Sequence, residues 1–281
     1  MNSTVTKASL TLANTHYENF PVASILLPLR LRRPIGLIYA FARQADDFAD
    51  EGEMPSEQRL ALLDGFRQEL DRIKAGTAPV TEFFRTLAAM IASHDLPLQP
   101  FYDLLDAFSQ DVVKTRYENI GEVMDYCRRS ANPIGRLLLQ LYGEATPRNI
   151  ALSDAICSAL QIINFLQDVA IDYKKDRIYL PRDEMEKFRI SEAQIARGDT
   201  SGTWWTFMQY EIERARKLLQ SGAPLGIALK GRVGLEMRTI IAGGETILRK
   251  LHRSRGDMFN QRPILGPWDW GRMLFKAIRA K

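Results

Sequence analysis

Apolar residues recur at intervals of three and four along most of the chain, the spacing that gathers them on one face of an α-helix. Runs in which apolar and polar residues alternate, as in half-buried strands, are scarce. Several prolines stand where a helical run begins. The pattern therefore predicts an all-α protein with helices over residues 34–50, 57–75, 80–93, 98–114, 120–128, 132–143, 148–174, 203–221, 232–252 and 267–279. We expect the segment 176–202 to hold loops with short helical turns.

No internal repeat or linker divides the sequence, so we expect one domain over residues 1–281, with a disordered N-terminus over 1–13. Hydrophobic residues make up 46% of the chain, enough for a large core. The only cysteines, Cys127 and Cys157, are too few for a disulfide framework and fit a reducing compartment. The N-terminus does not resemble a signal peptide, and we expect no apolar stretch that approaches the ~20 residues of a membrane span. These features predict a cytoplasmic protein, at most peripheral to the inner membrane.

The first chemical signal is a group of carboxylates near the end of the first predicted helix. Asp46 and Asp50 lie four residues apart, so they share a helix face and repel each other unless a cation lies between them. Hard oxygen ligands of this kind suit Mg²⁺, which usually takes one or two carboxylates together with water and phosphate oxygens. The same face continues back to Arg43 and Tyr39, and an arginine there can bind diphosphate oxygens bidentately.

The second signal has the same spacing. Asp168 and Asp172 lie four residues apart, and their face continues back through Asn164 to Gln161. The rest of this helix is apolar, so the polar stripe is hard to explain as a solvated surface. Acidic pairs are common on surface helices, and either pair alone is weak support for a site. Two pairs of this kind predict two helices that face each other across a bundle and hold Mg²⁺ and a diphosphate.

With these motifs, the sequence resembles the squalene/phytoene synthase family over residues 16–274. The matching segments are 39–50 (YAFARQADDFAD), 126–135 (YCRRSANPIG), 161–172 (QIINFLQDVAID) and 177–181 (RIYLP). Segment 16–24 (HYENFPVAS) and the end of segment 161–172 are most similar to the hydroxysqualene synthase branch of that family. At Gln167, where many family members have an arginine, the chain departs from the pattern. One positive charge fewer fits a substrate with a single diphosphate.

The resemblance implies a single-domain helical bundle with a central cavity and a set of site residues. Metal ligands would be Asp46, Asp50, Asn164, Asp168 and Asp172, and catalysis would rest on the four aspartates with Tyr39 and Arg43. Substrate would be bound by His16, Phe20, Tyr126, Gln161, Asn164, Phe165, Arg177 and Tyr179. Aromatic rings can stabilise a carbocation, and Phe41 is a further candidate for that role. For most of these rings, packing in the core is the commoner role.

The resemblance also implies a reaction: Mg²⁺-dependent removal of diphosphate from presqualene diphosphate, rearrangement of the cation and capture by water to give hydroxysqualene. NADPH is not expected, and a separate presqualene diphosphate synthase is a possible partner. An alternative is head-to-head condensation of two prenyl diphosphates to squalene, dehydrosqualene or a phytoene-type product. An alternative of another class is a non-catalytic helical assembly protein of the same fold.

The positive charge of the chain is concentrated at its C-terminal end. The net charge is +4, and residues 249–281 contain nine Lys/Arg against two acidic residues. No nucleic-acid recognition motif accompanies this charge, so nucleic acid is not expected as a partner. The segment 267–281 mixes Trp268, Trp270 and Phe275 with basic residues, a composition that suits either contact with a membrane surface or a helix that closes the bundle.

Overall fold

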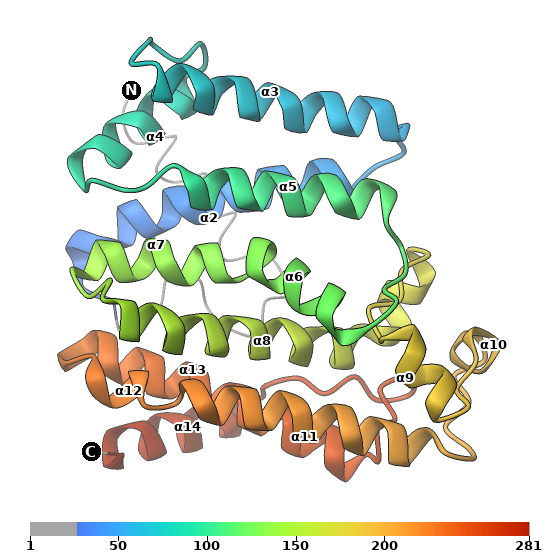
Figure 1. Ribbon diagram of the computed structural model, residues 1–281. Coiled ribbons are helices and arrows are strands. Elements are labelled where there is room, and N and C mark those ends of the chain that lie inside the picture. The colour runs from blue at the N-terminus through green and yellow to red at the C-terminus, as the bar shows by residue number, and fades with distance from the viewer. Residues whose placement is uncertain (1–26, 281) are drawn as a thin grey trace. The chain divides into compact units, whose positions relative to one another are not determined.

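The computed structural model describes residues 27–280, and its regular elements are α-helices (Figure 1). The long ones are α2 (Leu29–Asp50), α3 (Ser56–Lys74), α4 (Glu82–Ser93), α5 (Gln99–Val113), α6 (Ile120–Ser130), α7 (Asn132–Tyr142), α8 (Pro147–Lys174), α11 (Trp204–Gly222), α13 (Gly231–Arg253) and α14 (Pro267–Arg279). Short helices are α9 (Arg182–Lys187), α10 (Glu192–Ala196) and α12 (Leu225–Ala228). In residues 27–280 the β-type pairing is a single isolated bridge between Arg116 and Ile178. The prediction of an all-α fold is confirmed.

The contacts of the chain group into two compact units. Unit 1 comprises residues 1–114 and 129–150, and unit 2 comprises residues 115–128 and 151–281. The division falls inside α6 and α8, so no linker of distinctive composition marks it. That the whole chain forms one domain with a central cavity stays a prediction. The expected disordered segment 1–13 lies outside the described residues.

Unit 1 is built around phenylalanines. The ring of Phe41 on α2 is fully buried, with its centroid 5.5 Å from that of Phe66, 6.1 Å from Phe84 and 5.1 Å from Phe101. These rings come from α2, α3, α4 and α5, and most meet edge to face, the favoured geometry for aromatic pairs. Phe41 is therefore a core residue of unit 1, and the interpretation of it as a cation-stabilising ring is not supported.

Helix α2 begins five residues before the predicted start, and Pro34, the predicted first residue, is its sixth. A proline at this position has no N–H to donate to the carbonyl four residues earlier, so the helix loses one backbone hydrogen bond there. Leu31, Ile35 and Ile38 are buried on one face, and this burial favours continuing the helix past the proline. The consequence for the site is that Tyr39, Arg43 and Asp46 lie well inside a regular helix.

Unit 2 packs α11 and α13 around a core that includes Trp204, Phe207 and Leu248, all fully buried. The indole of Trp204 donates a hydrogen bond to the carbonyl of Gly256, at 2.8 Å, and so ties α11 to the chain just after α13. At Gly222, the end of α11 approaches α8 so closely that a Cβ atom would lie 2.6 Å from the carbonyl oxygen of Leu152. Only glycine fits there, and the close packing fixes α8 against α11.

Helix α8 carries the second polar stripe and also contains a long apolar segment. Among the described residues it is the one helix with the length and composition to cross a membrane, and half of its most apolar 18-residue window is buried in the protein. A core helix of a globular protein passes the same test of length and composition. By length and composition, α8 therefore departs from the expectation that no apolar stretch approaches the length of a membrane span.

Candidate active site

The first part of the candidate site lies on α2 in unit 1. Asp46 and Asp50 are half-buried, one turn apart on the same helix. Arg43 reaches both neighbouring carboxylates: its Nη1 lies 3.3 Å from Oδ2 of Asp46, and its Nη2 lies 2.7 Å from Oδ1 of Asp47. In this structure the arginine therefore neutralises part of the acidic cluster. Tyr39, one further turn back, is half-buried beside the phenylalanine core.

Neighbouring carboxylates influence one another in this cluster. Burial and repulsion from Asp50 together raise the pKa of Asp46 to about 7, and Arg43 opposes the rise. Asp111, near the end of α5, also contributes, although no sequence motif had singled it out. Since 37% of the Asp46 side chain remains accessible, water screens part of this repulsion. Carboxylates that repel one another form the kind of environment that a divalent cation stabilises.

The second part lies on α8 in unit 2. Gln161, Asn164, Asp168 and Asp172 are all half-buried, whereas Ile162, Ile163, Phe165 and Leu166 between them are buried. The predicted polar stripe therefore exists, and it remains partly open while the rest of this stretch is packed. Amide and carboxylate oxygens in this order along one face are suitable ligands for Mg²⁺ and for a phosphate-bearing substrate.

Asp168 has a partner that the sequence analysis missed. Arg262, 94 residues further along the chain, places its Nε 2.5 Å from Oδ1 and its Nη2 3.1 Å from Oδ2 of that carboxylate. The adjacent residue Gln167 is buried and donates a hydrogen bond from its amide to the carbonyl of Pro263. Two consecutive residues of α8 thus hold the segment 262–263. Gln167 anchors the chain at Pro263 to α8. The positive charge beside Asp168 is supplied by Arg262.

Four aromatic rings pack together in unit 2. The rings of Phe165 and Tyr179 stack at 3.8 Å with an interplanar angle of 5°. Tyr126 lies 5.8 Å from Phe165 and 5.6 Å from Tyr179, so three predicted substrate-binding residues meet. Tyr117 completes the cluster, 5.3 Å from Tyr179. Tyr117 was not predicted, and its only signal in the sequence is an aromatic residue nine positions before Tyr126.

The segment that follows α8 is held in place by residues 115–118. The amide of Ile178 donates to the carbonyl of Thr115, and the amide of Arg182 donates to the carbonyl of Tyr117, both at 2.9 Å. Arg116 adds a side-chain clamp, since its Nη1 lies 2.6 Å from the carbonyl oxygen of Asp176 and its Nη2 lies 2.9 Å from Oδ1 of the same residue. Asp176 has a left-handed φ of +56°, and these bonds hold that turn. Two of the predicted site residues lie within the clamped segment. Arg177 is half-buried there, and Tyr179 is buried.

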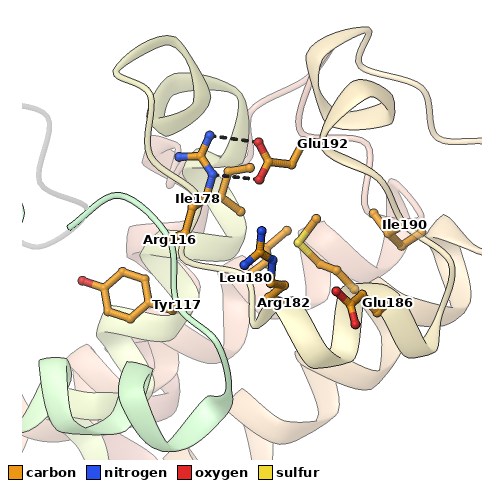
Figure 2. A pocket seen from close by; sticks show the side chains of 9 residues that line it. Arg116, Tyr117, Ile178, Leu180, Arg182, Glu186, Ile190 and Glu192 are labelled. Carbon is orange, nitrogen blue, oxygen red and sulfur yellow. Dashed lines mark hydrogen bonds and ion pairs between the residues drawn. The ribbon is translucent and has the colours of Figure 1, made fainter.

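A small pocket lies beside the same segment, and Figure 2 shows the side chains that line it. Arg116 is one of them and makes a bidentate ion pair with Glu192, with both N–O distances at 2.9 Å. The lining residues are Arg116, Tyr117, Ile178, Leu180, Arg182, Met185, Glu186, Ile190 and Glu192. None of the predicted site residues is among them. We therefore interpret this pocket as part of the support of segment 176–183.

Within residues 27–280, no group of three or more His, Cys, Asp or Glu side chains forms a ready-made metal site. The donor set nevertheless fits Mg²⁺, because this ion keeps several water ligands and takes one or two protein carboxylates together with substrate phosphates. The carboxylates around Asp46 and the polar stripe on α8 each offer oxygen ligands of that kind. His16 and Phe20, predicted to bind substrate, lie outside the described residues.

Comparison with known proteins places the chain among enzymes of isoprenoid metabolism. The family model for squalene/phytoene synthase matches residues 13–269. A hydroxysqualene synthase of Rhodopseudomonas palustris is 37% identical over 266 residues, which cover 94% of this chain and 89% of the relative. A phytoene synthase of Arthrospira platensis is 30% identical, with coverage of 89% and 85%. The crystal structure of the squalene synthase HpnC from Alicyclobacillus acidocaldarius is 35% identical, with a TM-score of 0.81 and coverage of 89% and 93%.

The fold, the paired carboxylates and these relatives define an all-helical enzyme that acts on isoprenoid diphosphates. The chain belongs to the squalene/phytoene synthase family. The resemblance inferred from its motifs is thereby confirmed, and the reading as a non-catalytic assembly protein is set aside.

Proposed function

We propose that this enzyme is a hydroxysqualene synthase that converts presqualene diphosphate to hydroxysqualene. The observation that carries the proposal most directly is the similarity to relatives of that name, at 37% identity over 94% and 79% of the chain. The reaction would start with heterolytic cleavage of the bond between carbon and diphosphate oxygen, in which the electron pair leaves with the diphosphate. Water would then add to the rearranged cation and release a proton.

Residues on α2 and α8 would bind the diphosphate. Asp46, Asp50, Asn164, Asp168 and Asp172 would hold Mg²⁺, which when bound supplies a Lewis acid that stabilises charge on the leaving group. Arg43 and Arg262 are each bound to an aspartate in this structure, and both have the geometry to donate bidentately to phosphate oxygens. Arginines that hold the carboxylates in the free enzyme would then bind the diphosphate once the carboxylates bind metal. The remaining polar atoms of the bound diphosphate would be oriented by Gln161, Tyr39 and Arg177.

The aromatic cluster would stabilise the cation. Four rings form one compact group, those of Tyr117, Tyr126, Phe165 and Tyr179. The face of an aromatic ring attracts a cation, and this attraction is stronger where water is excluded. The stacked pair of Phe165 and Tyr179 leaves little freedom for either ring, so their surfaces are fixed before substrate binds. The hydroxyl of Tyr179 or the amide of Asn164 would position the water that ends the reaction. No hydride donor is needed, so we propose that NADPH is not used.

A second candidate is the head-to-head condensation of two prenyl diphosphates. It is favoured by the similarity to a phytoene synthase at 30% identity and to the squalene synthase HpnC at 35% identity. The presence of Arg262 beside Asp168 also weakens the earlier inference that Gln167 leaves too little positive charge for two diphosphates. In either case we expect the enzyme to act in the cytoplasm, and in the first case a separate synthase must supply presqualene diphosphate.

Product analysis separates the two candidates. Purified enzyme is incubated with Mg²⁺ and either farnesyl diphosphate or presqualene diphosphate, with and without NADPH, and the extracted products are identified by mass spectrometry. The proposal predicts hydroxysqualene from presqualene diphosphate in both the presence and absence of NADPH, and no C30 product from farnesyl diphosphate alone. Squalene or dehydrosqualene from farnesyl diphosphate alone would establish the second candidate instead.

A further inference from the structure

Helix α14 is fixed against α13 by its inner face. Met273 and Ala277, one turn apart, are buried. Two charged residues of α13 hold the ends of the contact: Nζ of Lys250 lies 2.5 Å from Oδ2 of Asp269, and Nε of Arg238 lies 2.7 Å from the carbonyl oxygen of Ala277. Figure 1 shows α14 running alongside α13. These contacts determine which side of α14 faces away from unit 2.

The outward side of α14 is apolar. Trp268 is 89% exposed, Phe275 59% and Ile278 56%. Their spacing of seven and three residues places them on one face of the helix, opposite Met273 and Ala277. Single exposed apolar residues are common, but two large aromatic rings and an isoleucine aligned along one helix face form a patch. Burial of these side chains against a partner would be favourable, because it removes apolar surface from water.

The flank of this patch is basic. Arg272, Lys276 and Arg279 are all exposed, and the guanidinium carbon of Arg279 lies 5.1 Å from the centre of the Phe275 ring. The single acidic residue of the helix, Asp269, is already paired with Lys250, so it does not offset these charges. A positive flank around Trp and Phe side chains matches the chemistry of an interface between anionic lipid headgroups and acyl chains.

We propose that the outward face of α14, formed by Trp268, Phe275, Ile278 and the flanking Arg272, Lys276 and Arg279, docks onto an anionic lipid bilayer. A second copy of the chain fits less well, because a symmetric contact would bring the three cations of each copy together, and the centre of a protein interface is usually depleted of charge. The inference rests on the proposed function only for the reason why membrane binding would be useful, since hydroxysqualene, a C30 alcohol with a long apolar chain, partitions into the bilayer. The binding itself requires neither substrate nor metal.

Co-sedimentation with lipid vesicles tests the proposal. The full-length enzyme, without Mg²⁺ or substrate, is mixed with vesicles of phosphatidylcholine alone or of phosphatidylcholine with phosphatidylglycerol. We expect it to bind the anionic vesicles, and W268S/F275S to lower its partition coefficient by ~10-fold or more. R272Q/R279Q should weaken binding mainly at low salt. The matched control is V80S, which removes a 63% exposed apolar side chain in unit 1 and should change nothing.

Two outcomes would overturn the proposal. One is that W268S/F275S, with an unchanged circular dichroism spectrum, sediments with anionic vesicles as the wild type does, or that the wild type binds neither kind of vesicle. The other is that W268S/F275S abolishes self-association in analytical ultracentrifugation while vesicle binding is absent, which would assign the face to a second copy. Product analysis in detergent is independent of both results, so failure of the proposed reaction and failure of membrane docking can be told apart.

Discussion

Arg262 and Asp168 form a bidentate ion pair that joins the segment before α14 to the proposed metal-binding stripe of α8, with N–O distances of 2.5 and 3.1 Å. Both side chains are largely buried, at 20% and 23% exposed. In the free enzyme this pair satisfies a carboxylate that is proposed to bind Mg²⁺ during the reaction. If Asp168 binds the metal as proposed, Arg262 and Mg²⁺ would compete for the same oxygen atoms, and this competition can be measured.

Replacement of Arg262 by glutamine should destabilise the metal-free enzyme by ~1.5–3 kcal/mol, because a charge-assisted hydrogen-bonded pair is lost. Mg²⁺ should stabilise R262Q more than it stabilises the wild type, since Asp168 no longer has to release an arginine. Thermal unfolding at increasing Mg²⁺ concentrations measures both effects. The control is R128Q, which breaks a half-exposed pair with Asp125 and should behave as the wild type. Equal Mg²⁺ effects in R262Q and wild type would contradict the competition.

A second prediction concerns Arg116, which we interpret as a positioning residue. R116Q should remove the bonds to Asp176 and Glu192, loosen the segment that carries Arg177 and Tyr179, and lower kcat by ~10-fold or more with a smaller effect on KM. R116K keeps the charge but cannot make both bidentate contacts, so it should rescue little. The control R197Q breaks an exposed pair with Asp199 at 3.8 Å and should leave kcat unchanged. A wild-type kcat for R116Q would show that the clamp has no part in catalysis.

The sequence predicted more of the fold than of the site, and particular residues show why. Helical periodicity is local, so α2 to α8 and α11 to α14 were predicted closely, apart from the start of α2 and the four-residue helix α12. The carboxylate pairs also depend only on spacing along one helix. Arg262 and Arg116 were missed because their partners are 94 and 60 or more residues away, and no local pattern encodes such a contact. For Phe41 the sequence left both roles open, because a ring in the core and a ring in an active site look the same in sequence, and its burial favours the core.

The pH dependence of stability should report on Glu211, a buried carboxylate in unit 2. Burial and a shared hydrogen bond with Glu184 raise the pKa of Glu211 to about 8 from an ordinary value of 4.5. Arg214 donates to both carboxylates, to Glu184 at 2.7 Å and to Glu211 at 2.9 Å. Since the folded state holds this proton more tightly than the unfolded state, the stabilisation is complete below about pH 4.5 and is lost as the pH rises through about 8.

We therefore expect the Tm of the wild type to fall between pH 5 and pH 8 by ~5 °C more than that of E211Q, in which the neutral amide has no proton to lose. Differential scanning calorimetry at matched ionic strength measures this difference, and the other titrating groups cancel in the comparison. A parallel pH dependence in the two proteins would mean that Glu211 is ionised in the folded state throughout this range.

The aromatic cluster gives a prediction about chemistry rather than binding. F165L should keep a buried apolar residue at the position but remove the ring that stacks on Tyr179 at 3.8 Å. Loss of one cation–π contact of ~1–2 kcal/mol should lower kcat by ~5–30-fold while the affinity for a non-reactive diphosphate analogue stays the same. F83L, which alters a half-buried ring of unit 1, is the matched control. An F165L enzyme that loses analogue binding in proportion to kcat would instead indicate a role in substrate binding.

The central proposal is that the carboxylates of α2 and those of α8 bind the same diphosphate through Mg²⁺. Isothermal titration with a non-hydrolysable farnesyl diphosphate analogue, with and without Mg²⁺, tests it in D46N, D168N and the double variant. D106N and D125N, which remove exposed carboxylates from α5 and α6, serve as controls. The account predicts that each of D46N and D168N abolishes Mg²⁺-dependent binding, and that the double variant loses no more than either single one. Mg²⁺-dependent binding at wild-type affinity in either single variant would contradict it.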